Sequence, residues 1–260
     1  MTTQKLAILL VSFGTSFAES RRKTIDKILE DITASFPNHR IYQAWTSKTI
    51  IRIAQEREHL SIPTLEEVIT QMIADGITDL TVQPTYLIDG SENDMMKKTL
   101  LSLAPSSLKI RFGAPLLCST EDNYQVLQAV MHEFSTIPSE DALVFIGHGT
   151  THPANSVYSL LNNTLQDMGY SHSFVSTIKE YPNPEILMEQ ISHMGSHRIH
   201  LIPFMLVAGH HATKDIFGNN RDSWKSRFET AGFEVICHRK GLGEYENIRK
   251  IYLEHLKLFS

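Results

Sequence analysis

Cysteine is scarce in this sequence, with only Cys118 and Cys237 among 260 residues. Two cysteines exclude a disulfide framework, and their spacing does not fit a zinc motif. A basic surplus is also missing: the formal net charge is −5 at pH 7, which argues against general nucleic-acid binding. The apolar run LAILLVSF, residues 6–13, has the length of a strand and is far too short for a membrane span. We therefore expect neither nucleic acid nor membrane among the partners.

No basic segment leading into an apolar run and a small-residue cleavage site opens the sequence, so we expect the cytoplasm as its location. A phosphate-binding loop of the form GxxxxGK[ST] is missing, and the segment SFGTS at 12–16 lacks the lysine. We therefore expect neither ATP nor any other organic cofactor. What the chain has in quantity is apolar residues, 42% of the total, which is enough for sizeable cores.

Histidine is also abundant and unevenly distributed, because 11 of the 13 histidines lie from His132 onward. Imidazole titrates near neutrality and is the commonest metal ligand, so the second half is where we look for chemistry. For His152, which lies just beyond GHG, we leave open whether its role is functional or structural. We interpret a larger group as surface or satisfied core residues: His39, His59, His132, His172, His193, His197, His200, His238 and His255.

Apolar runs of strand length alternate with segments in which apolar residues recur every three or four positions. This alternation predicts βαβ units and mostly parallel sheets, and therefore an α/β fold. We expect strands at 5–12, 39–44, 79–85, 108–112, 141–147, 172–178, 198–204 and 233–237. We expect helices at 18–35, 64–75, 92–103, 121–134, 155–168, 183–194, 219–230 and 244–258.

The two halves of the chain carry the same landmarks in the same order. AILLVSFGTS at 7–16 resembles ALVFIGHGTT at 142–151, and LTVQPTYLIDG at 80–90 resembles IHLIPFMLVAG at 199–209. Because such a repeat within one sequence indicates a repeated structural unit, it predicts two similar α/β domains.

We place these two domains at 1–118 and 119–260. Open parallel sheets bind ligands outside the carboxyl ends of their strands. We therefore expect the two sheets to face a central cleft, with the functional residues at the strand ends.

The second copy of the first landmark ends in a histidine framed by glycines. In VFIGHGTTHPAN, residues 144–155, His148 follows a predicted strand and stands between Gly147 and Gly149. Glycine permits a tight turn, so His148 projects from a rigid strand end. A helix that opens near Pro153 points its N-terminal amides in roughly the same direction. Alternatively, the glycines only make the turn and His148 caps a neighbouring group.

The second copy of the other landmark, PFMLVAGHHATKD at 203–215, contains His210 and His211. One of these imidazoles can meet His148 if the two loops are neighbours in space. Adjacent histidines on a regular element rarely ligate the same ion, so we expect the other ring to point elsewhere.

A carboxylate for the same cleft comes from STIKEYPNPE at 176–185, where a predicted strand ends before Lys179 and Glu180. Two imidazoles and a carboxylate suit first-row divalent metals, and open coordination positions would mark a site of chemistry. Lys179 is protonated by default and repels a cation. The residues thus indicate a candidate metal site without fixing its third ligand.

Six segments together carry a resemblance to a known family: LLVSFGTSFAESR, VQPTYLIDG, GHGTTHPANSVYSLL, PFMLVAGHHATKD, DSWKSRFETAGFEV and GLGEYENIR. They cover nearly the whole chain, and their combination resembles the CbiK-type anaerobic sirohydrochlorin cobaltochelatases, class II chelatases related in fold to ferrochelatase. The resemblance implies two flavodoxin-like (Rossmann-like) domains around a cleft. It also implies a C-terminal helix, at about 245–260, that often packs back on the first domain.

The resemblance implies a metal held by two histidines and a glutamate. His148 matches the first histidine, in GHGT. His211 matches the second, because the family's AGDHA reads AGHHA here and places His210 at the aspartate's position. The family's V-E-x-Y-P corresponds to IKEYP, which places Lys179 at the glutamate's position and Glu180 one residue later. Since such a shift reverses the side chain's direction at a strand end, either Glu180 ligates after a backbone adjustment or His210 replaces the glutamate.

The activity implied is insertion of cobalt(II) into sirohydrochlorin in cobalamin biosynthesis, with the divalent ion as a substrate. His148 and His211 would ligate the metal and accept the pyrrole protons that the metal replaces. The tetrapyrrole is rich in carboxylates, and we expect it to bind at the loops after the strands. The candidate contacts are Phe13, Gly14, Thr15, Ser16, Tyr86 (where the family often has histidine), Gly149 and Thr150.

Other readings stay open. The changes at Lys179 and His210 favour a chelatase for nickel, iron or another tetrapyrrole. The lost glutamate favours a carrier that binds a tetrapyrrole or a metal without turnover, although the retained histidines favour the enzyme. A transport-type binding protein is disfavoured by the missing export signal, and a hydrolase by the missing serine or cysteine nucleophile. Homo-oligomers are common among such enzymes, but the sequence shows no strong interface signal.

Overall fold

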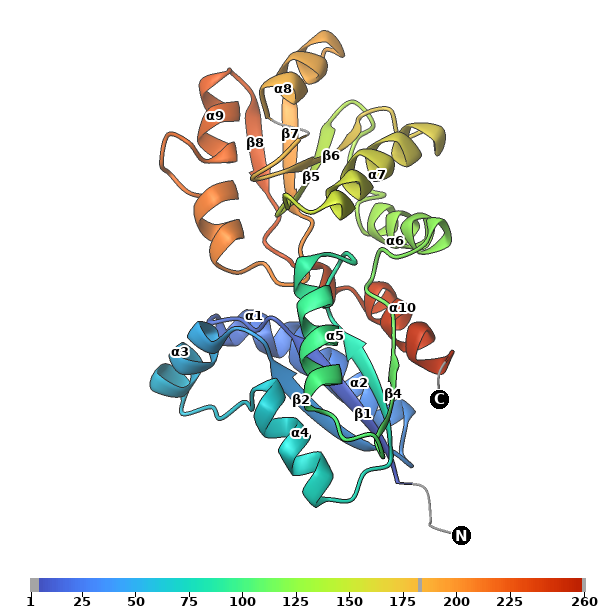
Figure 1. Cartoon of the computed structure of the whole chain (residues 1–260). Coiled ribbons are helices and arrows are strands. Elements are labelled where there is room, and N and C mark those ends of the chain that lie inside the picture. The colour runs from blue at the N-terminus through green and yellow to red at the C-terminus, as the bar shows by residue number, and fades with distance from the viewer. Residues whose placement is uncertain (1–4, 182–183, 259–260) are drawn as a thin grey trace. The chain divides into compact units, whose positions relative to one another are not determined.

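The computed structural model describes residues 5–181 and 184–258 (Figure 1). The chain divides into two compact units, one formed by Met1–Cys118 with Glu246–Ser260 and the other by Ser119–Tyr245. Among the described residues, no helix is both long enough and apolar enough to cross a membrane.

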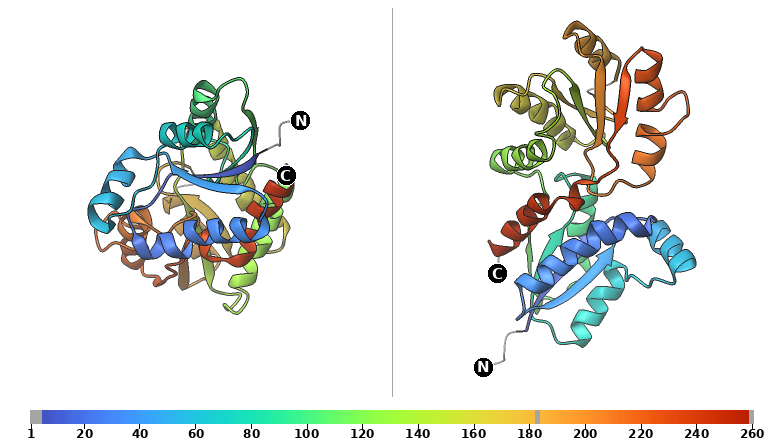
Figure 2. Two further views of the ribbon diagram at one scale, coloured as in Figure 1. Left: turned by 90° about the horizontal axis from the view of Figure 1, so that it is seen from below. Right: turned by 180° about the vertical axis from the view of Figure 1, so that it is seen from behind.

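The first unit is a four-stranded parallel sheet with helices on both faces, in the strand order β2-β1-β3-β4. Ala7, Leu9 and Val11 of β1 pack in one core with α4 and α5, whereas α2 and α10 lie together on the opposite face (Figure 2). Its elements are β1 (Leu6–Ser12), α1 (Ala18–Lys23), α2 (Ile25–Ser35), β2 (Arg40–Trp45), α3 (Lys48–Glu58), α4 (Leu65–Ala74), β3 (Asp79–Pro84), α5 (Ser91–Leu103), β4 (Lys109–Phe112) and α10 (Glu246–Lys257).

The second unit repeats this design with the strand order β6-β5-β7-β8, again all parallel. Ala142, Val144 and Ile146 of β5 share a core with α8, η2 and α9, while α6 and α7 lie on the other side (Figure 1). Its elements are α6 (Thr120–Glu133), β5 (Ala142–Gly147), η1 (Pro153–Asn155), α7 (Ser156–Asp167), β6 (Ser173–Thr177), α8 (Pro184–His193), β7 (Arg198–Pro203), η2 (Ala212–Ile216), α9 (Trp224–Thr230), β8 (Glu234–Cys237) and η3 (Leu242–Glu244).

The internal repeat extends to the strand register. Val11 pairs with Pro84 in the first sheet, and Ile146 pairs with Pro203 in the second. These are the positions that the sequence landmarks align with each other. In each sheet the strand order reverses beside the first strand, which makes a topological switch point where open sheets bind ligands. The predicted α/β fold with two parallel sheets is confirmed.

The predicted strands all form, and the differences lie in the helices. The predicted helix 18–35 is interrupted at Thr24, whose backbone leaves the helical region while its hydroxyl donates to the carbonyl of Ser20. The predicted helix 219–230 begins only at Trp224, where Ser223 caps it. Helix α3 and the π-helical turn η2 were not predicted. Residue 183, where we expected α8 to begin, lies outside the described residues.

Helix α10 is bound to the first unit by specific polar contacts as well as apolar packing. The Tyr252 hydroxyl, fully buried, donates to the carbonyl of Thr85 at 3.0 Å. Arg249 donates to the carboxylate of Asp31 on α2 at 2.7 Å. Burial raises the pKa of the Tyr252 hydroxyl far above its ordinary value, so it stays a neutral donor.

We expect Tyr252→Phe to lower the free energy of unfolding by about 1–2 kcal/mol, because it leaves the buried carbonyl of Thr85 without this donor. Thermal and urea unfolding would measure the loss. The matched control is Tyr124→Phe, which removes a hydroxyl from an exposed tyrosine. Equal stability of the two variants would show that the hydroxyl contributes nothing to the docking of α10.

Candidate metal centre

The two central strands of the second sheet bring two histidines together. His148 directly follows β5, and His211 lies in the segment after β7, the strand that pairs with β5. The two imidazole rings meet edge to face, with centroids 4.5 Å apart and planes at 71°. The structure thus joins the two residues that the sequence singled out, at the switch point of this sheet.

Both rings have the same nitrogen already occupied. His148 Nδ1 lies 3.0 Å from the carbonyl oxygen of Gly149, and His211 Nδ1 lies 2.7 Å from a carboxylate oxygen of Asp215. Since a carbonyl and an ionised carboxylate only accept hydrogen bonds, each Nδ1 carries the hydrogen. In the neutral form of either ring, the lone pair is therefore on Nε2, the nitrogen left for a metal or a proton. Asp215 was not predicted from the sequence, although its i,i+4 spacing from His211 was a usable signal.

The framing glycines are needed for separate reasons. A Cβ at Gly147 would lie 2.3 Å from the ring of Tyr158 on α7. Gly149 has a φ of +76°, and its Cβ would lie 3.0 Å from the side chain of Thr177 and 3.2 Å from the amide of Glu180. Only glycine lets the His148 turn pack this closely against the loop after β6.

Side-chain hydrogen bonds hold that neighbouring loop in place. The Thr177 hydroxyl donates to the carbonyl of Glu180 and accepts from its amide. Asn155 accepts from the amide of Thr150 at 2.9 Å and donates to the carbonyl of Tyr181 at 3.2 Å. These bonds connect the His148 turn to the segment that carries Lys179. A ligand at the Thr150 amide would have to share it with Asn155.

In the part of the chain that the structure describes, no third protein ligand is assembled beside the two histidines. Within the described part of the chain, none of the carboxylates or imidazoles joins His148 and His211 in a set whose ligand atoms all lie within 4.8 Å of one another. Glu180 is half-buried, and Lys179 before it is exposed. His210 is exposed, and its ring lies edge-on to His211 at 5.8 Å. The pair offers two nitrogens, and further ligands would have to come from water, substrate or side-chain movement.

The surroundings keep His148 neutral. Its pKa lies below the ordinary value of 6.5, chiefly because the ring is partly buried, and also because the positive charge of Lys179, and that of His211 when it is protonated, disfavour a charge on His148. Asp215 acts in the opposite direction, towards a higher pKa. His148 therefore keeps its lone pair to lower pH than an ordinary histidine does.

The candidate contacts in the first unit lie at the equivalent strand ends. Phe13 is 49% exposed, and Gly14, with a φ of +95°, packs against the ring of Trp45. The buried Thr15 hydroxyl accepts from the amide of Phe17, and Ser16 is half-buried. The Tyr86 hydroxyl lies 3.2 Å from that of Thr46, and burial raises the pKa of Tyr86 to about 12. Phe13 and Tyr86 thus follow β1 and β3, as His148 and His211 follow β5 and β7.

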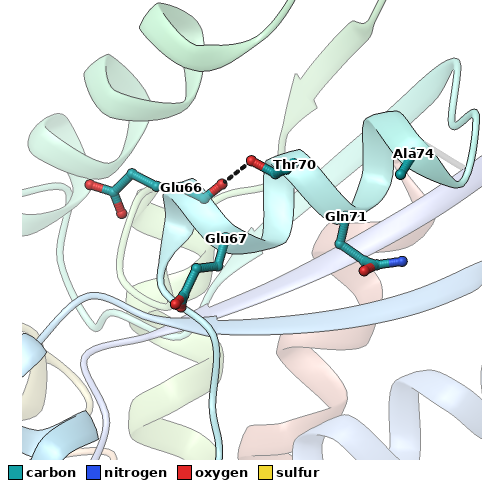
Figure 3. A pocket seen from close by; sticks show the side chains of 5 residues that line it. All are labelled: Glu66, Glu67, Thr70, Gln71 and Ala74. Carbon is teal, nitrogen blue, oxygen red and sulfur yellow. Dashed lines mark hydrogen bonds between the residues drawn. The ribbon is translucent and has the colours of Figure 1, made fainter.

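Two other histidines make hydrogen bonds that explain their positions structurally. His200 bridges Asp141 and His238 inside the second unit, and His152 Nδ1 accepts from the Ala154 amide at the start of η1. A depression on α4 carries none of the predicted site residues, and the Thr70 hydroxyl there donates to the carbonyl of Glu66 (Figure 3). Its lining is Glu66, Glu67, Thr70, Gln71 and Ala74.

Comparison with known proteins decides the family. Residues 6–259 match the model of the cobalt chelatase (CbiK) family. The chain belongs to the CbiK family. Within it, the chain is 33% identical to the sirohydrochlorin cobaltochelatase of Salmonella typhimurium, over 97% of this chain and 95% of that one. It is 28% identical to the sirohydrochlorin cobaltochelatase CbiKC of Nitratidesulfovibrio vulgaris, over 97% and 89%.

Solved structures with the same fold are more distant in sequence. The CbiK-family chain matches SirB from Bacillus subtilis with Fe3+ at a TM-score of 0.72 and 18% identity, covering 98% of this chain and 95% of that one. The sirohydrochlorin chelatase SirB from Bacillus subtilis subspecies spizizenii, in complex with cobalt, matches at a TM-score of 0.69 and 17% identity, over 98% and 94%. These likenesses show a shared class II chelatase fold.

We expect Gly149→Ala to lower both stability and Co2+ affinity. Its positive φ costs about 1 kcal/mol for any side chain, and the Cβ also pushes on Thr177 and the Glu180 amide. Gly169→Ala is the matched control, because Gly169 has a φ of +86° and nothing within 4 Å of its Cβ position. Thermal unfolding and Co2+ titration would compare them. Identical behaviour of the two variants would mean that the close approach does not hold the site.

We expect an NMR titration of the metal-free protein to give His148 a pKa below 6.5. In Lys179→Gln the pKa should move up, but not fully to 6.5, since burial is the larger cause. Arg221→Gln removes an exposed charge from the same unit and serves as the control. An unchanged pKa in Lys179→Gln would place the lysine's ammonium away from the ring.

Proposed function

We propose that this chain inserts cobalt(II) into sirohydrochlorin, in the cytoplasmic synthesis of cobalamin. The support from comparison is membership of the CbiK family over nearly the whole chain and 33% identity to a sirohydrochlorin cobaltochelatase. The structural observation that carries the proposal is the pair of imidazoles with centroids 4.5 Å apart, each with Nδ1 occupied.

The chemistry of this pair fits metal insertion. The reaction exchanges a divalent ion for two pyrrole N–H protons. A neutral imidazole can donate its Nε2 lone pair to the incoming ion and, once the ion has moved to the macrocycle, to a proton. His148 and His211 together provide one such nitrogen for each proton released. We therefore propose both residues as metal ligands and proton acceptors.

The weak ligand set is part of the same proposal. Among the residues that the structure describes, His148 and His211 are not joined by a third ligand, and the charge of Lys179 acts on His148. A nearby ammonium repels a cation, so the ion is held loosely and is free to transfer. The same exposed ammonium can receive a carboxylate of the tetrapyrrole, which a protein of net charge −5 must attract locally. Phe13, Tyr86 and the loops around Gly14 and Gly149 are our candidate contacts for the macrocycle.

The resemblance described above places Lys179 and His210 where the family has a glutamate and an aspartate, and both positions bear on metal choice. Nitrogen ligands suit cobalt, nickel and ferrous iron alike, and affinity alone rises from iron through cobalt to nickel. Glu180 or His210 would complete the ligand set only after a change in side-chain position. Cobalt remains the proposed metal because both relatives carry it in their names.

The test is an anaerobic insertion assay with sirohydrochlorin and Co2+, Ni2+ or Fe2+, run with substrate in excess over protein. We expect many turnovers, fastest with cobalt. Activity should fall roughly 10²-fold or more in His148→Ala and His211→Ala, since each change removes a ligand and a base. His193→Ala, which alters an exposed histidine of the same unit, should keep full activity.

The other outcomes separate the alternatives. Fastest turnover with nickel or iron would show that the residues around the histidines have changed the metal. Binding of one tetrapyrrole per chain with no further product would identify a carrier. Full activity in His211→Ala would disprove the assigned site while leaving the family reaction in place.

A further inference from the structure

The carboxylate of Asp215 is held against His211 by an unusual turn. His211 precedes η2, a π-helical turn closed by a hydrogen bond of 2.9 Å from the amide of Phe217 to the carbonyl of Ala212. Ala212 and Ile216 are almost fully buried, at 1% and 0% exposure, and they fix the turn in the core of the second unit. π-helical turns are rare in proteins, and those that occur often lie at functional sites.

The hydrogen bond between the two side chains has a chemical consequence. Asp215 Oδ2 lies 2.7 Å from His211 Nδ1, a distance typical of a charge-assisted bond. Nδ1 and Nε2 are on opposite sides of the imidazole, so an oxygen bound at Nδ1 cannot ligate an ion bound at Nε2. The carboxylate therefore acts on the metal only through the ring.

The two histidines differ in how they are held. His148 Nδ1 is fixed by the main-chain carbonyl of Gly149, which no substitution removes. His211, whose side chain is 43% exposed, is fixed by a side chain. Asp215 also carries a negative charge that acts on His148 in opposition to Lys179. Its carboxylate contacts His211 directly, at a site where Lys179 adds positive charge.

We propose that Asp215 is the positioning residue of the metal site. It holds His211 in the Nδ1–H tautomer, points Nε2 at the incoming ion, and makes the ring a stronger donor. This inference rests on the proposed function, because it gives Asp215 a part in the site formed by the two histidines.

The test uses Co2+ alone as the probe of the whole chain. Wild type, Asp215→Ala, Asp215→Asn and His211→Ala would be titrated with Co2+, followed by calorimetry and by the visible absorption of the bound ion. We expect Asp215→Ala to bind Co2+ about 10–100-fold more weakly, with a changed spectrum. Asp215→Asn, which keeps an acceptor oxygen but no charge, should recover part of the affinity. Asp222→Ala, an exposed carboxylate in the segment that follows, should bind as wild type does.

A second readout needs no metal. Long-range 1H–15N NMR of the metal-free protein should show His211 as a single Nδ1–H tautomer, and as a mixture in Asp215→Ala. In the insertion assay, the KM for Co2+ should rise more than kcat falls.

The failures are distinguishable. If His211→Ala loses Co2+ while Asp215→Ala binds it within twofold of wild type and keeps the tautomer, the positioning role is wrong and the proposed site stands. If His211→Ala binds Co2+ as tightly as wild type, the site itself is wrong, and this inference with it.

Discussion

The parallel pairing of β5 with β7 is the interaction on which the candidate site depends. It sets Ile146 beside Pro203, so the two chains leave the sheet at neighbouring points. His148 is one step beyond its strand and is turned by Gly149, whereas His211 is reached through a longer segment and anchored by a π-helical turn. Two imidazoles that are far apart in the sequence thus lie side by side, because hydrogen bonding between the strands fixes where each loop starts.

The charges around His148 and His211 determine how this pair can bind a cation. Burial keeps His148 neutral, Lys179 reinforces that effect, and Asp215 opposes it while holding His211. The set therefore consists of two imidazole donors with one positive and one negative side chain nearby. Such a set favours loose, reversible contact with a cation, as expected for an ion that has to leave. A structural metal site would instead surround the ion with anionic ligands and close its coordination.

The sequence predicted the sheets well because the central strands are continuous apolar runs; every residue of β5 is buried. Helix α3 was missed because its charged sequence buries only Ala54. The turn η2 is too short to show a period. The meeting of His148 and His211 followed from the repeat, but the position of Glu180 did not, because the hydroxyl of Thr177 sets the course of that loop. Local side-chain hydrogen bonds of this kind do not appear in the periodic pattern of apolar residues from which helices and strands are predicted.

Two helices lie in a different compact unit from the strand that precedes them. Helix α6 follows β4 but lies in the second unit, where Phe134 at its end contacts Phe145 of β5, and α10 follows β8 but packs on α2 in the first. During synthesis, the first sheet therefore keeps part of one face uncovered until α10 has left the ribosome. A nascent chain that stops before α10 would expose apolar strand surface, so the order of translation makes the docking of α10 the step that completes the first unit.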